Sequence, residues 1–444
     1  MDCDAHELAR PVKVAIVGGG WAGIAAATML ADAGQDITVF EMAPQLGGRA
    51  RSVAGEPDYD NGQHILIGAY RDSLALMRRL GVDPEAVLQR LPLALPYPGE
   101  PGLRLPPGPP LVAFTRGVLA HRGWPLGARL GLLAAAGGWL ARRFRCDGRL
   151  SVADLCAGLH ATVKRDLVEP LCVAALNTPA RQASAQVFLR VLQDALFSGA
   201  GSADLLLPRR PLSELLAGPA TAWLGERLRL GRRVQCLEPG WHVDGEAFDA
   251  VVLACTSGEA ARLVAPFAPD WAVTAQGLRF EPIITVYLHS PGSRLPSPMM
   301  ALREGPDAPA QFVFDHGQLG GAPGRFAFVV SGAAPWVERG GCAEAVLAQA
   351  GRELSWASPP AIDRVLTEKR ATFACTPDLT RPPARIATGL FAAGDYIAGP
   401  YPATLEGAVR AGLAAAQGLL AADDASDGGS AANGAASGSP TNTP

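Results

Sequence analysis

Three glycines near the start of the chain have the spacing of a phosphate-binding turn. Gly18, Gly20 and Gly23 follow a short apolar run at residues 13–17 and open an alanine-rich segment. Between a strand and a helix, the first glycine permits a tight turn and the second lets the backbone approach a pyrophosphate. The third lets helix and strand pack closely. The pattern predicts a bound dinucleotide, with a glycine turn that holds no ligand as the alternative.

The residues after this turn complete the nucleotide site. A helix beginning at Trp21 and Ala22 would present free N–H groups, and the positive end of its dipole, to the phosphates. Glu41 ends the next apolar run, where an acid accepts hydrogen bonds from ribose hydroxyls. Because a carboxylate repels a 2′-phosphate, we expect a nucleotide that lacks one.

Two further segments identify the kind of nucleotide. Gly47-Gly48-Arg49 comes shortly after Glu41, and residues 392–408 contain Gly394-Asp395 and then Thr404-Leu405-Glu406. Both segments resemble fingerprints of the flavin amine oxidase and phytoene desaturase superfamily. This resemblance implies FAD rather than NAD, since a dehydrogenase that needs only a nicotinamide has no use for the C-terminal segment. We expect non-covalent binding, because no cysteine lies in the final motif.

The resemblance also implies a role for each segment. In that superfamily the Gly-Asp pair receives the ribityl chain and the pyrophosphate. The helix after the threonine, which caps it, points its N-terminus at the pyrimidine edge of the flavin. A strand near residue 234 touches adenine through its backbone. Arg49 suits a phosphate contact, and a structural ion pair is its alternative. The implied cofactor contacts beyond the first turn are Gly48, Arg49, Val234, Gly394, Asp395, Thr404, Leu405 and Glu406, with backbone groups serving at the last two.

Residues 60–70 indicate a branch of the superfamily. They read Asp-Asn-Gly-Gln-His-Ile-Leu-Ile-Gly-Ala-Tyr, and Gly62, Gln63 and His64 stand where the backbone approaches the flavin ring. With residues 394–408, this segment resembles the hydroxysqualene dehydroxylases of bacterial hopanoid synthesis, also called squalene-associated FAD-dependent desaturases. The resemblance implies a C30 isoprenoid substrate, hydroxysqualene, which loses its hydroxyl to give squalene with FADH2 as reductant. The electron donor that reduces the FAD has no signature in the chain.

Loss of a hydroxyl requires a proton donor, and four residues are candidates. His64 titrates near neutrality, although it would equally serve by holding its turn or packing on the flavin. Asp60 would donate only with a raised pKa, and anchoring the turn is its alternative. Tyr396 and Tyr401 flank the flavin motif and could donate a hydrogen bond or line the pocket.

Three other functions remain open from the residues alone. A carotenoid-type desaturase would use the same cofactor to remove hydrogen from an isoprenoid. An amine oxidase often places a lysine near the flavin, and only Lys164 and Lys369 are available for that role. The third is a flavoprotein partner without catalysis, for which the chain offers no dedicated interaction module.

Composition excludes several classes of protein. The formal net charge is −3, which does not predict nucleic-acid binding. The 8 cysteines form no C-x-x-C pair and have no zinc spacing, so we expect no metal site and a reducing cytoplasm, with packed thiols at Cys156, Cys172 and Cys255. Residues 1–11 carry acids and no apolar stretch, unlike a signal peptide.

One apolar segment suggests contact with a membrane. Residues 126–140 are too short to span a bilayer, and arginines flank them within residues 122–145. They could form an interfacial surface that takes substrate from the inner face of the cytoplasmic membrane. A buried core helix is the alternative, and Trp124 and Trp139 fit either account.

The elements that position these residues predict an α/β fold. We expect a GR2-type, Rossmann-like FAD-binding domain from residues 11–70, 205–280 and 385–422. Residues 71–204 and 281–384 would form an inserted substrate domain with a helical cap and an antiparallel sheet, and residues 423–444 a disordered tail. Strands are expected at 233–237, 251–254, 283–288, 311–314 and 326–330, helices at 24–33, 343–356, 405–420 and through much of 111–196, and irregular chain at 91–110.

Overall fold

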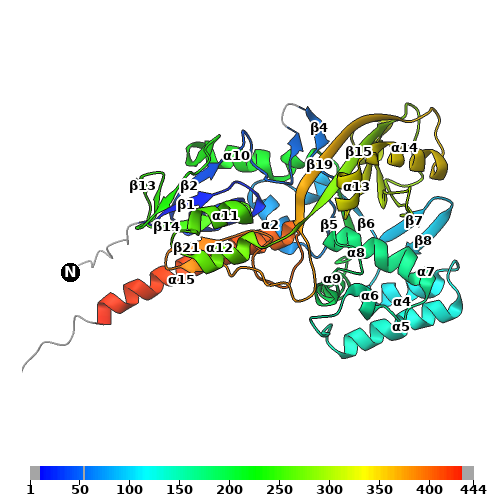
Figure 1. The fold of residues 1–444 in the computed structure, drawn as a ribbon, viewed down its shortest axis with the longest axis horizontal. Helices are drawn as coiled ribbons and strands as arrows, with labels where there is room; N and C mark the ends of the chain where they lie inside the picture. The colour runs from blue at the N-terminus through cyan, green and yellow to red at the C-terminus, as the bar shows by residue number, and fades with distance from the viewer. Residues whose placement is uncertain (1–10, 54–55, 433–444) are drawn as a thin grey trace, which may run out of the picture.

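The computed structural model describes residues 11–53 and 56–432 (Figure 1). Two earlier expectations concern residues outside this description. They are the absence of a signal peptide at the N-terminus and the disordered tail at residues 433–444, and Cys3 also lies outside it.

A six-stranded sheet carries the nucleotide-binding turn. Its first five strands are parallel and β20 is antiparallel to its neighbour. The buried apolar runs of β1 and β14 suit a parallel sheet covered on both faces. The strands, in spatial order, are β10 (Leu228–Leu230), β2 (Asp36–Glu41), β1 (Lys13–Val17), β14 (Ala250–Leu253), β21 (Leu390–Ala392) and β20 (Arg385–Ala387).

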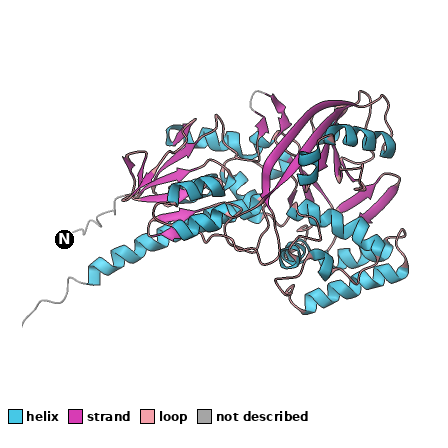
Figure 2. Ribbon diagram, viewed as in Figure 1, coloured by secondary structure: helices cyan, strands magenta, loops and turns pink. Residues whose placement is uncertain are grey.

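Two helices from opposite ends of the chain pack together on this sheet. Helix α1 (Trp21–Asp32) follows β1 directly, and α15 (Leu405–Ala432) returns from the C-terminus to pack against it. Figure 2 shows α15 as the long helix that runs along the lower side of this sheet. The expected disordered tail is therefore wrong for residues 423–432, which continue α15. Extending an existing helix avoids the cost of nucleation, so α15 continues into this stretch although it contains two glycines and three aspartates.

A five-stranded antiparallel sheet forms the second layer, as expected from the alternating runs. Its inner strands are almost wholly buried, and its edge strand β19 is long and largely exposed. Its order is β16 (Met299–Ala301), β17 (Phe312–Asp315), β18 (Arg325–Val330), β15 (Phe280–His289) and β19 (Ala361–Phe373), with α13 (Ala334–Arg339) and α14 (Cys342–Glu353) nearby.

Helices dominate residues 110–197. Near Pro170, which has no N–H to donate, the helix widens to a π turn in which the Glu169 N–H donates to the Lys164 carbonyl. No helix among the described residues is long and apolar enough to cross a membrane. These helices are α4 (Pro110–Ala120), α5 (Leu126–Ala141), α6 (Val152–Leu155), α7 (Ala161–Val163), η1 (Lys164–Val168), α8 (Glu169–Leu176) and α9 (Ala185–Phe197).

Two local expectations are wrong. Residues 91–110 contain a hairpin, β7 (Ala94–Tyr97) with β8 (Glu100–Arg104), whose turn uses Gly99 at φ +73°. Residues 233–236 form no strand.

The remaining elements are β3 (Ser52–Val53), β4 (Glu56–Asp60), β5 (Leu66–Ile67), α2 (Arg71–Arg79), α3 (Pro84–Val87), β6 (Leu88–Leu91), β9 (Leu205–Pro208), η2 (Ser213–Ala217), α10 (Gly218–Leu224), η3 (Gly225–Arg227), β11 (Leu237–Glu238), β12 (His242–Val243), β13 (Glu246–Ala247), α11 (Ser257–Val264), α12 (Pro269–Gln276) and η4 (His316–Leu319).

Candidate active site

The glycine turn lies where β1 passes into α1, and each glycine meets a steric demand. Gly18 has φ +114°, and a Cβ there would lie 2.5 Å from the Ala254 carbonyl oxygen. A Cβ on Gly23 would lie 1.9 Å from the Gly18 oxygen. Gly23 does not line the cavity described below, so its place is between helix and strand. Only glycine permits this close packing.

A cavity of about 540 Å³ opens in front of this turn. Gly20 and Gly48 both line it and lie against each other, since a Cβ on Gly48 would lie 3.2 Å from the Gly20 Cα. Because neither residue has a side chain, the cavity reaches bare backbone beside the N-terminus of α1, and we call this part of the cavity the slot. Trp21 and Ala22 also line this slot. The slot suits a pyrophosphate by shape and by the direction of the helix dipole.

Glu41 lies on the wall of the cavity, at the end of β2. Its Oε2 accepts from the Gly19 N–H at 2.8 Å, and its Oε1 accepts from the Ala43 N–H at 2.7 Å. The buried carboxylate therefore holds the glycine turn and also faces the cavity. A carboxylate oxygen has lone pairs for further donors, so Glu41 can also receive ribose hydroxyls.

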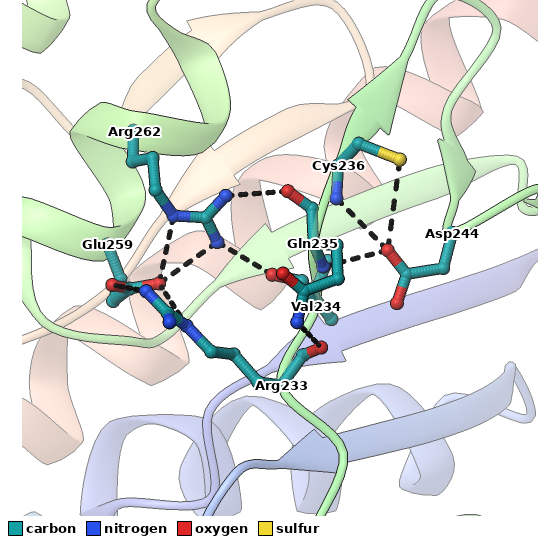
Figure 3. Close-up of polar contacts among 7 residues, drawn as sticks. All are labelled: Arg233, Val234, Gln235, Cys236, Asp244, Glu259 and Arg262. Atoms are coloured by element: carbon teal, nitrogen blue, oxygen red, sulfur yellow. Dashed lines mark hydrogen bonds and ion pairs between the residues drawn. The ribbon is translucent and has the colours of Figure 1, made fainter.

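Side chains rather than a strand hold the segment around Val234 (Figure 3). The Arg262 guanidinium of α11 donates to the carbonyls of Val234 at 2.7 Å and Gln235 at 2.5 Å. Asp244 accepts from the N–H of Gln235 at 2.8 Å and of Cys236 at 3.0 Å. No acceptor among the described residues meets the Val234 N–H, which remains available at the cavity wall.

Arg49 joins both ends of the chain at the cavity. Its Nη2 donates to Asp395 Oδ1 at 2.6 Å, and its Nη1 donates to the Ala371 carbonyl at 2.7 Å. Gly394, Asp395 and Arg49 all line the cavity. The ion pair that was the alternative for Arg49 is therefore present, and it links the second glycine segment to the Gly-Asp segment and to β19.

The N-terminus of α15 also faces the cavity. Thr404 Oγ1 accepts from the Gly407 N–H at 3.0 Å and so caps the helix, and Leu405 lines the wall beside it. The Glu406 carboxylate does not line the cavity and instead accepts from the Ser73 N–H and hydroxyl. The Glu406 carboxylate therefore holds α2, and the expected backbone contact of Glu406 with the cofactor stays a prediction.

The far part of the cavity is apolar and comes from different elements. Helix α8 supplies one wall and the five-stranded sheet supplies the other. Its apolar lining residues are Val173, Ala174, Ala175, Phe280, Ile283, Phe312, Phe314 and Val329. A cavity with phosphate-binding backbone at one end and aliphatic and aromatic walls at the other suits a nucleotide together with an apolar substrate.

Two of the four candidate acids reach the cavity. His64 lines it with Gly62 and Gln63, and its Nδ1 lies 3.1 Å from the Gly62 carbonyl. Burial lowers the pKa of His64, and Arg49 lowers it further; the neutral ring donates from Nδ1 and holds its own turn. Tyr396 also lines the cavity, and burial raises its pKa well above the usual value. Its hydroxyl is buried and has no hydrogen-bond partner in the described part of the chain.

The other two candidates lie elsewhere, which corrects their catalytic assignment. Asp60 accepts from Ser52 Oγ at 2.7 Å and from the Leu212 N–H at 2.9 Å, and it does not line the cavity. Tyr401 accepts from Arg190 at 2.8 Å and Arg410 at 2.6 Å, beside a separate small pocket. Asp60 anchors a turn, and Tyr401 is enclosed by two guanidinium groups.

Several cavity residues have no signal in the sequence. Asn177 has φ +47° and binds the Glu281 carbonyl, Thr372 Oγ1 and the Gly332 N–H, so it ties the end of α8 to both edges of β15. Glu368 on β19 accepts from Asn61 Nδ2 at 2.9 Å. Three further cavity residues, Asn61, Ile65 and Tyr70, belong to the segment 60–70 that the sequence singles out, although none of them was predicted individually. Neither Lys164 nor Lys369 lines the cavity.

Comparison with known proteins gives this cavity a family. Residues 21–420 match the family described as flavin containing amine oxidoreductase. The chain belongs to this family.

Individual relatives add detail. The chain is 29% identical over 450 residues to a hydroxysqualene dehydroxylase of Rhodopseudomonas palustris, with 92% of this chain and 98% of the relative covered. It is 34% identical over 96 residues, 21% of this chain and 17% of the relative, to a 15-cis-phytoene desaturase of Arabidopsis thaliana. An oxidoreductase from Methanosarcina mazei has the same fold, with a TM-score of 0.70 at 14% identity over 91% of this chain and 100% of that one.

The cofactor of this flavin containing oxidoreductase is FAD, and the residues of the cavity fit it. Gly20 and Gly48 present bare backbone to the slot, where a pyrophosphate can approach closely. Trp21 Nε1 and the Tyr396 hydroxyl, both on the cavity wall, are buried donors with no partner among the described residues. Buried donors are rarely left unpaired, so these two indicate a polar ligand. The expected α/β fold with a parallel FAD-binding sheet is confirmed.

Proposed function

We propose that this chain removes the hydroxyl group of hydroxysqualene to give squalene. The observation that carries the proposal is the apolar end of the cavity, between α8 and the five-stranded sheet, which continues directly from the nucleotide slot. We assign FAD binding to residues 11–70, 205–280 and 385–422, and substrate binding to residues 71–204 and 281–384. The full-length similarity to a hydroxysqualene dehydroxylase supports the choice of substrate.

The chemistry divides between cofactor and protein. Reduced FAD, when bound, supplies the hydride that replaces the hydroxyl. The protein would bind the nucleotide through the glycine slot, Glu41, the Val234 N–H and the N-termini of α1 and α15. Phe280, Phe312 and Phe314 would hold the hydrocarbon and exclude water. The carbon–oxygen bond breaks, a carbon–hydrogen bond forms, and the hydroxyl leaves as water after taking up a proton.

An anaerobic single-turnover experiment tests this function. The purified protein is reduced with dithionite, mixed with hydroxysqualene in detergent, and followed by flavin absorbance and by extraction of lipid. We expect one flavin reoxidised for each squalene formed, and no reoxidation when squalene replaces hydroxysqualene. A flavin that stays reduced, together with bleaching of the oxidised protein by a polyene precursor, would instead establish a desaturase. Bleaching by an amine would establish an amine oxidase.

We further propose that helices α4 and α5 dock on an anionic bilayer. The two helices pack together at the edge of the molecule far from the free end of α15 (Figure 1). Apart from Arg129, α5 carries no charged residue, and Leu126 and Leu130 are 58% and 51% exposed. Leu111, Val112 and Leu119 of α4 are also exposed.

The charge around these helices complements an anionic lipid surface. No acidic residue occurs between Glu100 and Asp147, although the whole chain has a net charge of −3. Arg129 donates to the Leu119 carbonyl at 2.7 Å, which joins the helices. Arginines near a membrane surface attract anionic headgroups by about 1 kcal/mol each. The arginines of this segment are Arg104, Arg116, Arg122, Arg129, Arg142, Arg143 and Arg145.

Sedimentation with lipid vesicles tests the docking surface. The chain should bind vesicles that contain phosphatidylglycerol more tightly than vesicles of phosphatidylcholine alone. Changing Leu126 and Leu130 to serine should reduce binding to both, and each of Arg142→Gln and Arg145→Gln should weaken binding to anionic vesicles about fivefold. Val273→Ser, at a 71% exposed site on α12, is the matched control. Equal effects of the control and the α5 variants would contradict the proposal.

A further inference from the structure

The turn after β4 is held from several sides. The Tyr287 hydroxyl of β15 donates to the Asp60 carbonyl at 3.1 Å, and the Asn61 N–H donates to the Arg51 carbonyl at 2.8 Å. Gly62, at φ +129°, lets the chain reverse there. The next side chain, Gln63, therefore leaves a fixed backbone and lies on the cavity wall.

The Gln63 side chain is oriented by a half-buried histidine, His316. Its Oε1 lies 3.2 Å from His316 Nε2, and the His316 ring packs edge-to-face on Tyr287 with 5.6 Å between centroids. Burial lowers the pKa of His316 to about 4, and Arg325 adds to the effect. The ring is therefore neutral near pH 7. Since a carbonyl oxygen only accepts, His316 donates from Nε2.

This hydrogen bond fixes which end of the Gln63 amide is free. With Oε1 engaged by His316, the amide nitrogen carries two N–H donors. No acceptor among the described residues binds them. The side chain of Gln63 is only half-buried and belongs to the cavity lining, together with His64 and Ile65. The cavity thus contains an oriented, uncharged donor close to its apolar end.

We propose that the Gln63 amide donates a hydrogen bond to the hydroxyl oxygen of the substrate, and that His316 acts as a positioning residue for that amide. This inference rests on the proposed function, because it takes an isoprenoid alcohol as the substrate. A neutral donor holds the hydroxyl oxygen in place while that oxygen takes up its proton and the carbon–oxygen bond lengthens. It also lets the site bind the alcohol more tightly than the hydrocarbon product, because the hydrocarbon has no hydrogen-bond acceptor.

The experiment compares the affinities of the alcohol and the hydrocarbon. Hydroxysqualene and squalene are titrated separately into the oxidised holoenzyme, and the change in flavin absorbance gives each dissociation constant. The wild type should bind the alcohol about tenfold more tightly, the value of one hydrogen bond. Gln63→Leu should bring the ratio close to one, and His316→Phe should lower it in part. Gln417→Leu, at an exposed site on α15, should leave it unchanged.

Two further measurements make the result decisive. The dissociation constant for FAD and the thermal midpoint of each variant show whether the fold and the cofactor site are intact. If Gln63→Leu leaves the ratio of the two dissociation constants unchanged, the proposal is overturned. If the ratio is unchanged but the affinity for FAD falls, the amide instead binds the cofactor. Because the ratio is a binding measurement, it stands apart from the turnover test, in which absence of squalene would refute the proposed function.

Discussion

Glu41 uses both carboxylate oxygens on backbone N–H groups of its own neighbourhood. Gly19 and Ala43 donate to it, so the charge of Glu41 is offset and the glycine turn is held in shape. A ligand hydroxyl that joins these donors would meet an acceptor already in position. At this residue, organising the turn and binding the ribose are parts of one arrangement.

Replacing Glu41 with glutamine should weaken FAD binding about 10- to 100-fold. The amide keeps the volume but has a single acceptor oxygen, and a hydrogen bond to a charged group contributes about 1.5–3 kcal/mol. Titration of the apoprotein with FAD measures the change. Glu226→Gln, at an exposed site on η3, is the control. Wild-type affinity in Glu41→Gln would show that the carboxylate is not needed.

Asp60 should make the stability of the protein depend on pH. Burial raises its pKa from 3.8 to about 6, against the hydrogen bonds from Leu212 and Ser52 that lower it. Between these two pH values the folded state holds a proton that the unfolded state has lost. Stability therefore falls as pH rises from about 4 to about 6, by about 3 kcal/mol in total, and does not change further above that range.

Denaturant unfolding at pH 4, 5, 6 and 7 measures this effect. Subtracting the free energy of unfolding of Asp60→Asn from that of the wild type should leave the slope that belongs to Asp60. The exposed Gln417→Leu on α15, which removes no titratable group, should give a difference that does not vary with pH. A difference for Asp60→Asn that is equally flat would refute the raised pKa.

At the scale of elements, α1 is enclosed by contacts that only glycine permits. Gly23 brings its inner face against the strand turn. On the α15 side, a Cβ on Gly412 would lie 2.1 Å from the Ala22 carbonyl oxygen. The N-terminus of α1, which faces the phosphate slot, is therefore fixed by a helix at the opposite end of the chain.

Gly412→Ala should destabilise the fold by about 1–3 kcal/mol, since an inserted methyl group must push α15 away from α1. It should also weaken FAD binding, because Ala22 lies in the slot. The thermal midpoint and the bound flavin per protein give both readouts. Gly131→Ala on α5, where a Cβ meets nothing within 4 Å, should be neutral or slightly stabilising. Equal behaviour of the two variants would rule out this tight packing.

Local pattern predicted the elements around the glycine turn, because a buried strand, a glycine and a helix start are all short-range signals. It failed at residues 91–110, where glycines mark a hairpin. A Cβ on Gly102 would lie 1.7 Å from the Leu95 carbonyl oxygen, a contact made only after the strands pair. It failed at residues 233–236 because Arg262 and Asp244 hold that segment from elsewhere in the chain.

At the candidate site, too, residues with short-range sequence signals could be predicted, and residues that arrive through tertiary packing could not. Gly20, Glu41 and Asp395 were predicted from the spacing of their motifs, and the structure places all three at one cavity. Asn177 and Phe312 reach the wall through tertiary packing, and nothing near them in the sequence indicates it. The Asp60 side chain, one residue before the turn, points to Ser52 and away from the cavity. Alternation along a single segment does not reveal which side chain faces a distant wall.

At the scale of the whole molecule, FAD should stabilise both layers together. Arg49 joins Asp395 to the Ala371 carbonyl of β19, so a ligand in the slot touches the parallel sheet and the antiparallel sheet at once. FAD at 1,000 times its dissociation constant should add about 4 kcal/mol to the free energy of unfolding.

Hydrogen–deuterium exchange with and without FAD would show this coupling. Amides at residues 17–22 and at 368–372 should both exchange more slowly in the holoprotein. Residues 342–353 of α14, outside the cavity, serve as the internal reference. Protection confined to residues 17–22 would mean that the second sheet does not respond to the cofactor.

The pairing of α1 with α15 has a consequence for biosynthesis. The ribosome releases the glycine turn early, and Asp395, Thr404 and the helix behind Ala22 come last. Until then the nascent chain exposes a half-built slot that cannot retain FAD. A premature stop before Leu405 would leave most of the polypeptide intact and still produce a colourless protein that added cofactor could not rescue.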